Sequence, residues 1–335
     1  MPYTHDQRAD EEARVAVSVR DVAAAASVSV GTVSNVLNHP DKVATATVER
    51  VTAAIRELGF VRNDAARQLR AGHSRSIGMI VLDAGNPFFA AVARGAEGRA
   101  AQEHLSVLLG NSDEDASRQS AHLDLFREQR VRGILITPVD GGAVEKLKRL
   151  DEEGIPVVLV DHEVAETSFA SVSVDDVEGG WLAANHLLEQ GRRRLAFVGG
   201  LASIAQVAHR LEGARRAVAE VPGATLEVIE MPALTVLHGR AAGEKIGARD
   251  AAARPDAIFA ANDLLAVGML QGLMILGSLR VPDDIALIGY DDIDFASSTV
   301  VPLSSVRQPA ELIGHTAVEL LLKTIGDLTG RSSAK

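Results

Sequence analysis

Polar side chains that could hold a small molecule follow several apolar runs of this 335-residue sequence. Asn86 comes shortly after "SIGMIVL", Asn262 directly follows "DAIFAA", and Asp291 ends "IALIGYD". Ligands of open α/β sheets bind beyond the carboxyl ends of the strands, at helix N-termini. Asn86 and Asn262 are also good helix caps, so capping a helix or turn is the alternative role. The spacing predicts a binding site for a small molecule.

Residues for catalysis or metal binding do not occur in a recognisable pattern. No G-x-G-x-x-G opens a βα unit, and neither a P-loop nor a G-x-S-x-G motif is present. The ten histidines have no metal-like spacing, "DHE" at 161–163 is a lone cluster, and there is no cysteine. We therefore expect no catalytic residue, no metal site and no cofactor. An α/β enzyme is the less favoured alternative.

The elements that would position the polar residues are two series of apolar runs, alternating with amphipathic helical stretches. This rhythm is typical of βαβ units around a parallel sheet. Two series give too many strands for one small sheet, so we expect two doubly wound α/β subdomains. The expected strands are "SIGMIVL", "LSVLLG", "GILITP" and "PVVLV", then "LAFVGG", "TLEVIEM", "DAIFAA" and "IALIGYDD".

Residues 18–60 have a different pattern, that of three short helices. Ser18 and Ser29 are N-cap candidates for helices over 19–26 and 30–37, and Gly59 ends a third over 45–58. A small core is expected from the residues at helical spacing: Val22, Ala26, Val33, Val36, Leu37, Val48, Val51 and Ile55. Two helices joined by a tight turn predict a helix-turn-helix, whose second helix enters the DNA major groove. A small bundle with a solvated face is the alternative.

Charge separates this region from the rest of the chain. Residues 18–75 carry eight Lys and Arg against five Asp and Glu, whereas the whole chain has a net charge of −11 at pH 7. The basic region would be drawn to a polyanion that repels the acidic remainder. Its last part, "FVRNDAARQLRAGHSRS", predicts a helix of roughly two turns that forms only against a supporting surface. A plain basic connector is the alternative.

The composition indicates a soluble protein of a reducing compartment. The chain is 47% hydrophobic, and the absence of cysteine excludes a disulfide framework. Residues 1–17 contain four acidic residues and no apolar core of a signal peptide, and no later run is long enough to span a bilayer. We expect a disordered tail over 1–17, a cytoplasmic location and no membrane contact.

The chain from about Val19 to Gly326 resembles the LacI-type (LacI/GalR) transcriptional regulators. The resemblance depends on stretches found in the family's order, among them "VRDVAAAASVSVGTVSNVLN", "IGMIVLDAGNPFFAAVARG", "NSDED", "HRLEGARRAV", "FAANDLLAVGML", "LRVPDDIALIGYDD" and "PLSSVRQP". It implies an all-α helix-turn-helix head over 18–60 and a hinge helix with its linker over 61–75. It also implies an α/β core over 76–335, similar to periplasmic sugar-binding proteins, that binds an effector and forms a homodimer. Its first subdomain would cover about 76–162 and 305–328, and its second about 163–304.

The resemblance also implies which residues contact double-stranded DNA at a pseudo-palindromic operator. Val30, Gly31 and Asn35 would face the major groove, where Val30 could meet a thymine methyl and Asn35 could pair with adenine. Leu69 would wedge into the minor groove at the operator centre and bend the duplex. The expected contact residues are Ser29, Val30, Gly31, Thr32, Ser34, Asn35, Asn63 and Leu69.

For the effector, the resemblance implies Arg210, Asn262 and Asp291 as polar contacts and Phe88 as a ring lining the cleft. Donors and acceptors around an aromatic face suit a sugar or related polyhydroxylated ligand. Arg210 could instead pair with Glu212 or Asp263, and Trp181 is expected in core packing. Ile204 and Gln206 lie where purine-responsive relatives carry polar contacts, and Ile204 argues against a purine. The expected effector-binding residues are Asn86, Phe88, Asp161, Arg210, Asn262 and Asp291, with Asp83 a weaker candidate.

Two features depart from the family pattern. Ala44 stands where relatives place a capping Ser, so either Thr45 caps one residue late or the cap is lost, at a cost of about 0.5–2 kcal/mol. The last predicted helix, 310–325, is followed by "GDLTGRSSAK", where relatives continue into a final strand, so a core without that strand is expected.

These observations predict an effector-controlled, DNA-binding transcriptional repressor. Inducer and corepressor are both compatible with the sequence. The alternatives are a cytoplasmic small-molecule binding protein and a degenerate regulator that no longer switches. A periplasmic sugar-binding protein is disfavoured, because it would carry a signal peptide and no helix-turn-helix.

Overall fold

The computed structural model describes residues 17–60, 74–162, 169–200, 204–276 and 278–333. The chain divides into two units, residues 1–72 and 73–335, and each is described by itself. Among the described residues, no helix is long and apolar enough to cross a membrane.

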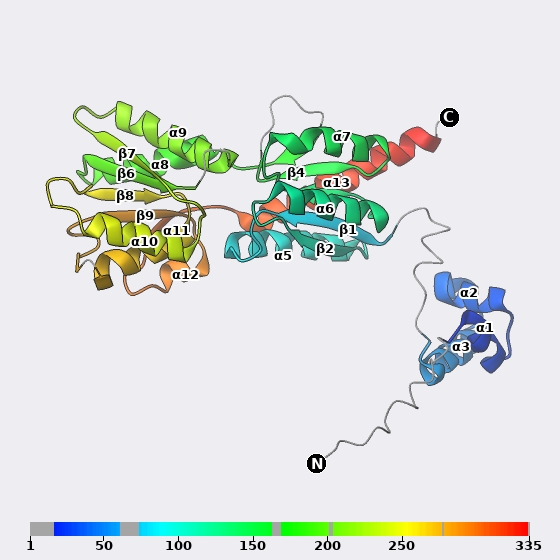
Figure 1. The fold of residues 1–335 in the computed structure, drawn as a ribbon. Helices are drawn as coiled ribbons and strands as arrows, with labels where there is room; N and C mark the ends of the chain where they lie inside the picture. Colours follow the sequence, from blue (N-terminus) through cyan, green and yellow to red (C-terminus); the bar gives the residue numbers. More distant parts are fainter. Residues whose placement is uncertain (1–16, 61–73, 163–168, 201–203, 277, 334–335) are drawn as a thin grey trace, which may run out of the picture. The chain divides into compact units, whose positions relative to one another are not determined.

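The described part of the first unit is helical (Figure 1). It consists of α1 (Val19–Ala25), α2 (Val30–Asn38), the short 3-10 helix η1 (Pro40–Lys42) and α3 (Thr45–Leu58). The Oγ of Ser18 accepts a hydrogen bond from the N–H of Asp21, and the carboxylate of Asp21 accepts one from the N–H of Ser18, which closes a capping box. Gly59 ends α3 in the left-handed region, at φ 62°.

The N-terminus of α3 has no side-chain cap. Ala44 is the N-cap residue and makes no side-chain hydrogen bond, while Thr45 is already the first helical residue. A late cap by Thr45, one of the two outcomes that the sequence allowed, is therefore not formed. The first turn of α3 keeps N–H groups without side-chain acceptors.

Apolar residues of the three helices close a core as their spacing predicted. Val22, Val33 and Val51 are completely buried. Val48, Leu37 and Ile55, also expected in this core, are partly buried against it. The complete set of buried residues is Val22, Ala23, Ala26, Val33, Val36, Val51 and Ala54.

The second unit contains two parallel sheets, each with five strands in the described residues. The first sheet has the order β2 (Ser106–Asn111), β1 (Ser76–Val81), β3 (Ile134–Ile136), β4 (Val157–Val160) and β5 (Ala170–Val172). The second has the order β10 (Ser304–Arg307), β9 (Ala286–Asp291), β8 (Ala257–Ala260), β6 (Arg194–Gly199) and β7 (Thr225–Glu230). The expected mixed architecture of an all-α head and two doubly wound subdomains is confirmed.

Helices cover both faces of each sheet (Figure 1). The first subdomain carries α5 (Pro87–Gln102), α6 (Ala116–Glu128), the 3-10 helix η2 (Gly141–Ala143), α7 (Val144–Glu152) and α13 (Ala310–Ser333). The second carries α8 (Asp176–Glu189), α9 (Ala205–Ala219), α10 (Val236–Gly247), α11 (Asp263–Gln271), the π-helical turn η3 (Gly272–Leu276) and α12 (Asp294–Ser297).

Two strands lie outside the subdomain boundaries that the sequence predicted. β5 belongs to the first sheet because it pairs with β4, although it lies beyond residue 162. β10 pairs with β9 in the second sheet, although the sequence placed residues from about 305 onward in the first subdomain. The chain thus crosses between the sheets just before α8 and again between β10 and α13. In addition, α13 runs to Ser333 rather than 325, and no strand follows it in the described residues.

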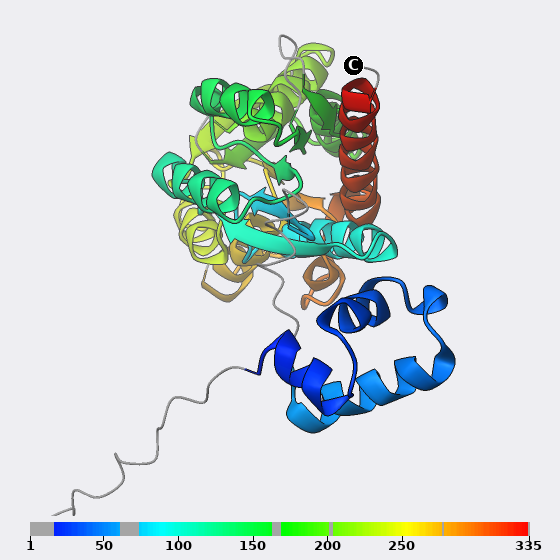
Figure 2. The ribbon, with the colours of Figure 1, turned by 90° about the vertical axis from the view of Figure 1, so that its right-hand side faces the viewer.

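In three pairs of helices, each helix has a glycine facing the backbone of the other, so the two backbones can touch. A Cβ on Gly95 of α5 would lie 1.9 Å from the carbonyl oxygen of Glu311, and one on Gly314 of α13 would lie 1.8 Å from that of Val92. Figure 2 shows α13, in red, beside α5, in cyan. Gly180 and Gly213 serve α8 and α9 in the same way, and Gly239 and Gly268 serve α10 and α11.

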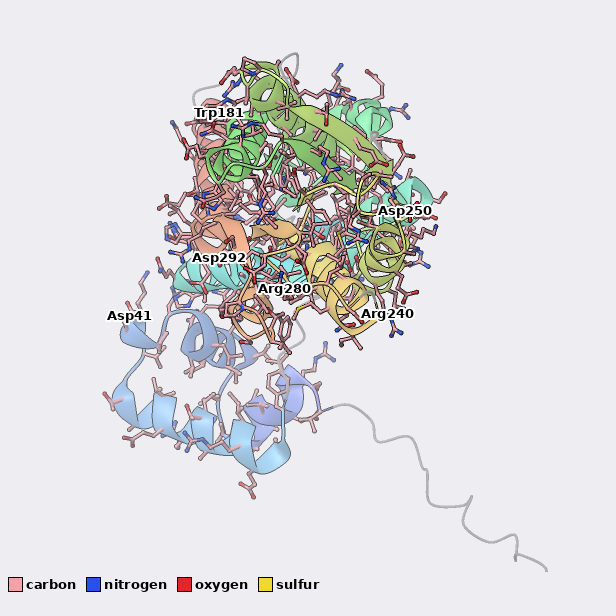
Figure 3. The ribbon with its side chains drawn as sticks, turned by 90° about the vertical axis from the view of Figure 1, so that its left-hand side faces the viewer. Asp41, Trp181, Arg240, Asp250, Arg280 and Asp292 are labelled. Carbon is pink, nitrogen blue, oxygen red and sulfur yellow. The ribbon has the colours of Figure 1, made fainter. Side chains whose placement is uncertain are left out.

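Trp181 contributes to packing, as its position predicted. It lies on α8 toward the outside of the second subdomain (Figure 3). Its ring is partly buried against the core, and its Nε1 donates a hydrogen bond to Glu220 over 3.1 Å.

Candidate functional site

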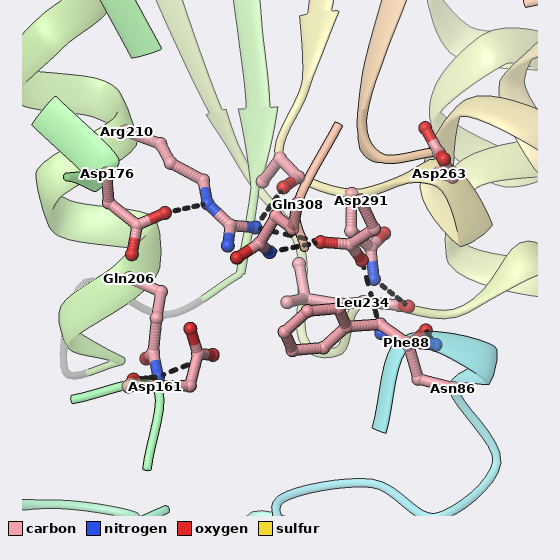
Figure 4. Close-up of polar contacts among 12 residues, drawn as sticks. Asn86, Phe88, Asp161, Asp176, Gln206, Arg210, Leu234, Asp263, Asp291 and Gln308 are labelled. Atoms are coloured by element: carbon pink, nitrogen blue, oxygen red, sulfur yellow. Dashed lines mark hydrogen bonds and ion pairs between the residues drawn. The ribbon is translucent and has the colours of Figure 1, made fainter. Parts of the chain in front are cut away.

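An open pocket lies between the two subdomains, with about 460 Å³ of empty space when the solvent at its mouth is included. All six predicted effector-binding residues line it, together with Asp83. Figure 4 shows how Asn86, Phe88, Asp161, Arg210 and Asp291 converge from separate elements. The first subdomain contributes Leu82, Asp83, Asn86, Phe88, Phe89, Glu114 and Asp161, and the second contributes Ile204, Gln206, Val207, Arg210, Leu234, Asn262 and Asp291.

The two asparagines both cap a helix and line the pocket. Asn86 begins α5, and its Oδ1 accepts a hydrogen bond from the N–H of Phe88 over 3.0 Å. Asn262 begins α11, and its Oδ1 accepts one from the N–H of Leu265 over 2.9 Å. Capping occupies the Oδ1 atoms and leaves the Nδ2 groups for other partners, so the two roles do not compete.

Arg210 is held rigidly at the floor of the pocket. Its Nε donates to Asp176 Oδ1 over 2.8 Å, and its Nη1 donates to the carbonyl oxygen of Ala261 over 2.8 Å. The guanidinium also lies 3.7 Å from the centre of the Tyr290 ring. Burial disfavours the charge, but Asp176 and Asp291 outweigh it and raise the pKa of Arg210 above its ordinary value. The predicted alternative partners, Glu212 and Asp263, are not used.

Asp291 connects the two subdomains. Its Oδ1 accepts a hydrogen bond from Gln308 over 2.8 Å, and its Oδ2 accepts one from Asn86 of the first subdomain over 3.4 Å. Its backbone has φ 107°, a strained conformation for a residue with a side chain. Burial raises the pKa of Asp291 to about 6, even though Arg210, Gln308 and Asn86 favour the ionised form.

Asp161 makes the second polar link between the subdomains. Gln206 Nε2 donates to its backbone oxygen and, over 3.2 Å, to its Oδ2. Its Oδ1 is buried and has no hydrogen-bond partner among the described residues. Burial, followed by the charge of Asp176, raises the pKa of Asp161 well above its ordinary value.

An apolar wall completes the pocket. Phe88 is buried, and its ring packs edge-on against that of Phe89 with 5.1 Å between the centroids. Ile204, Val207 and Leu234 line the opposite subdomain's side. An aromatic ring and aliphatic groups next to a few fixed polar groups are typical of a small-molecule site.

The structure adds residues that the sequence did not identify as site members. Asp176 and Tyr290 fix Arg210, and Gln308 fixes Asp291. Glu114 lines the pocket, and the "NSDED" stretch that contains it is one of those shared with the family. Tyr290 directly precedes Asp291 at a strand end, and Gln308 lies in "PLSSVRQP", another stretch shared with the family, whereas nothing local marks Asp176.

In the first unit, α2 presents the predicted DNA contacts on its outer face. Ser29, Val30, Gly31 and Asn35 are exposed, while Thr32 and Ser34 are half-buried. Ser29 Oγ accepts a hydrogen bond from the N–H of Thr32 over 3.0 Å and therefore caps the helix. Asn63 and Leu69 lie outside the described residues.

A helix-turn-helix unit together with a two-subdomain core around a polar pocket defines a transcriptional regulator that binds a ligand. Residues 18–63 match the family model "Bacterial regulatory proteins, lacI family", and residues 184–334 match "Periplasmic binding protein-like domain". The chain belongs to the LacI family.

Relatives and solved structures agree with this assignment. The HTH-type transcriptional repressor PurR of Aliivibrio fischeri (strain MJ11) is 34% identical over 313 residues, which are 92% of each chain. The Lac repressor bound to ONPG in the repressed state superposes with a TM-score of 0.81 at 26% identity, over 93% of this chain and 94% of that chain. The complex of the transcriptional regulator CelR with cellobiose gives a TM-score of 0.67 at 30% identity, with the same coverage. The protein is a DNA-binding transcriptional repressor with a ligand-binding core, not an enzyme.

Proposed function

We propose that this repressor acts as a homodimer and that its effector is a sugar or a related polyhydroxylated molecule bound in the pocket of Figure 4. The observation that carries the proposal is the convergence of fixed donors and acceptors beside the Phe88 ring. Arg210 and the Nδ2 group of Asn262 supply donors, and Asp161 and Asp291 supply acceptors. Hydroxyl groups both donate and accept, so a polyol can use both kinds. The similarity to the CelR–cellobiose complex supports a sugar.

A purine base is the second candidate, because the curated relatives include repressors named PurR. A planar base could stack on Phe88. However, Ile204 and Leu234 present only aliphatic groups to the pocket, so a base would find no hydrogen-bond partner at these two positions. The lining therefore favours the sugar.

The pocket is placed to control how the subdomains close. Two hydrogen-bonded links cross it, from Asn86 to Asp291 and from Gln206 to Asp161. An effector inserted between these groups replaces one or both links with its own contacts. It switches the repressor only if it binds one closure state better than the other.

For DNA, we propose that the exposed face of α2 and the segment after α3 make the contacts. Val30, Gly31 and Asn35 would face base edges in the major groove, with Ser29, Thr32 and Ser34 near phosphates. Asn63 would cap the hinge helix that carries Leu69. A symmetric dimer then requires a pseudo-palindromic operator.

Titration of the full-length protein with a panel of sugars and purine bases tests the effector proposal. A sugar at one hundred times its Kd should stabilise the protein by about 2.7 kcal/mol in thermal unfolding. Phe88→Leu should weaken this sugar at least tenfold, because the ring face is lost. Phe126→Leu is the matched control, since Phe126 is equally buried in the first subdomain but does not line the pocket. Binding of purine bases alone, with no response to any sugar, would contradict the proposal.

A further inference from the structure

The charges that line the pocket are unbalanced. Its described lining contains four carboxylates, Asp83, Glu114, Asp161 and Asp291, against the single guanidinium of Arg210. The described lining therefore carries more acidic than basic side chains.

The one cation of the lining is already matched. Arg210 lies 2.8 Å from Asp176, with 5% of each side chain exposed. Its distance to Asp291 Oδ1 is 3.8 Å. Asp176 thus neutralises most of the positive charge of Arg210. The guanidinium cannot also fully neutralise the carboxylates that line the pocket.

Asp161 is the carboxylate of the described lining that most clearly lacks a hydrogen-bond partner and a counter-charge. It is only 3% exposed and lines the pocket, and its buried Oδ1 has no hydrogen-bond partner among the described residues, since Gln206 donates to its other oxygens. Asp161 also lines an adjoining cavity, and the basic groups in the described lining of that cavity are His162 and His209. Burial, together with His209, lowers the pKa of His162, so it does not supply a positive charge at neutral pH.

Other compensating cations are also missing from the described lining. Arg118 pairs with Asp113 over 2.7 Å and does not reach the pocket. No group of three or more His, Asp or Glu in the described residues is arranged to hold a metal ion. A buried carboxylate without a counter-charge is costly to ionise, which is why the pKa of Asp161 is raised. A bound cation would offset that cost, whereas a hydroxyl would satisfy hydrogen bonds and bring no charge.

We infer that the effector carries a protonated amine beside its hydroxyl groups, with the ammonium directed at Asp161. The ligand class is a polyhydroxylated amine, such as an amino sugar. The inference rests on the proposed function of the pocket and makes it more specific. An ammonium offers three donors and a positive charge, which gives charge-assisted hydrogen bonds to carboxylates. Sugar phosphates and sugar acids are excluded, because they would add negative charge to an acidic site.

Matched ligand pairs test the inference by calorimetry on the full-length protein in an amine-free buffer. The pairs are D-glucosamine with D-glucose, D-galactosamine with D-galactose, and 1-amino-1-deoxysorbitol with sorbitol. N-acetyl-D-glucosamine and glucose 6-phosphate complete the panel. At least one amine should bind tenfold or more tighter than its hydroxyl partner, a difference of about 1.4 kcal/mol. N-acetylation, which removes the charge, should abolish the gain.

Asp161→Asn should reduce the preference for the amine to less than threefold, because the amide keeps the shape and loses the charge. Glu153→Gln is the control, since this exposed carboxylate pairs with Arg127 outside the pocket. A preference that survives Asp161→Asn would overturn the role of Asp161.

The remaining outcomes separate this inference from the proposed function. Neutral sugars that bind as tightly as their amines, or a sugar phosphate that binds best, would overturn the inference and leave a polyhydroxylated effector standing. Failure of every amine to bind would also overturn it. If purine bases were the only ligands found, both the polyhydroxylated effector and its protonated amine would be wrong.

Discussion

At the residue scale, Asp263 links three parts of the second subdomain through one buried carboxylate. Ser305 Oγ of β10 donates to its Oδ1 over 2.7 Å, and the N–H of Ile293 donates to its Oδ2 over 2.9 Å. Burial raises the pKa of Asp263 to about 7, although both hydrogen bonds act in the opposite direction. The folded state thus retains a proton that the unfolded chain releases near pH 4.

This shift predicts a pH-dependent stability. Between about pH 4 and 7 the folded protein binds more protons at Asp263 than the unfolded chain, so the stability that Asp263 contributes is lost as the pH rises through 7. Asp263→Asn cannot ionise. The free energy of unfolding of the variant relative to the wild type should therefore increase from pH 5 to pH 8, by an amount on the order of 1–4 kcal/mol.

Urea unfolding of both proteins at several pH values measures this difference. Asp140→Asn is the control, because Asp140 is an exposed residue that also accepts a backbone hydrogen bond at a helix start. A difference between Asp263→Asn and the wild type that stays constant from pH 5 to 8 would show that Asp263 is ionised throughout.

Single residues also show which contacts of the site could be predicted from the sequence and which could not. Asn262 and Asp291 could be predicted to lie close together because the parallel strands β8 and β9 end at the same edge of one sheet, whereas Asn86 follows β1 of the other sheet. The partner of Arg210 could not be predicted. Glu212 and Asp263 were considered because one is close in sequence and the other follows Asn262, yet Asp176 on a neighbouring helix takes the guanidinium. Which carboxylate it meets depends on how α8 and α9 cross, and local sequence does not specify that crossing.

At the scale of elements, the crossing of α5 and α13 determines where Asn86 and Phe88 lie. Gly314→Ala would place a Cβ 1.8 Å from the carbonyl oxygen of Val92, so the helices must separate. We expect a loss of about 1–3 kcal/mol in the free energy of unfolding, as is typical of overpacking. Effector affinity should fall as well, because α5 carries two residues of the pocket.

Gly98→Ala is the matched control for this prediction. Gly98 lies on the same helix, α5, and a Cβ there meets nothing within 4 Å. It should stabilise the protein by about 0.5–1 kcal/mol, because alanine favours the helix more than glycine does. Equal effects of the two substitutions on stability would contradict a specific role of glycine at the crossing.

The helices and strands themselves were largely predictable, because each has its own periodicity, caps and breakers. α3 begins and ends at the predicted residues, Thr45 and Leu58. The sheet membership of β5 and β10 was not predictable in the same way. Each has only three or four residues, and its place depends on pairing with β4 or β9 rather than on its own pattern.

At the scale of the whole molecule, the contacts between subdomains join residues far apart in the chain. Asn86 and Asp291 are separated by 205 positions. Their places at strand ends predicted that both contact the ligand, whereas the hydrogen bond between them depends on the degree of closure. The charge distribution is a second property of the whole chain. It is acidic overall, at −11, although residues 18–75 have an excess of basic residues.

This distribution predicts how salt affects DNA binding. An operator selected from a random-sequence library should bind the full-length protein with an affinity that falls steeply between 50 and 200 mM salt, since counterions are released from each contacted phosphate. The first helix of a helix-turn-helix crosses the DNA backbone, and Arg20 is exposed on α1. Arg20→Gln should therefore lower the slope of log affinity against log salt by about one for each bound head. Asn35→Ala should leave the slope unchanged and relax the preference at one base pair, because its proposed partner is an adenine rather than a phosphate.

Arg215→Gln provides the control for net charge. Arg215 is exposed on α9 of the acidic unit, and its replacement changes the total charge by the same amount as Arg20→Gln. If DNA attracts the basic unit locally, Arg215→Gln leaves the slope unchanged. Equal slopes for Arg20→Gln and Arg215→Gln, both lower than that of the wild type, would mean that only the net charge of the chain matters. A slope that Arg20→Gln does not change would place α1 away from the phosphates and contradict the proposed orientation of the head on DNA.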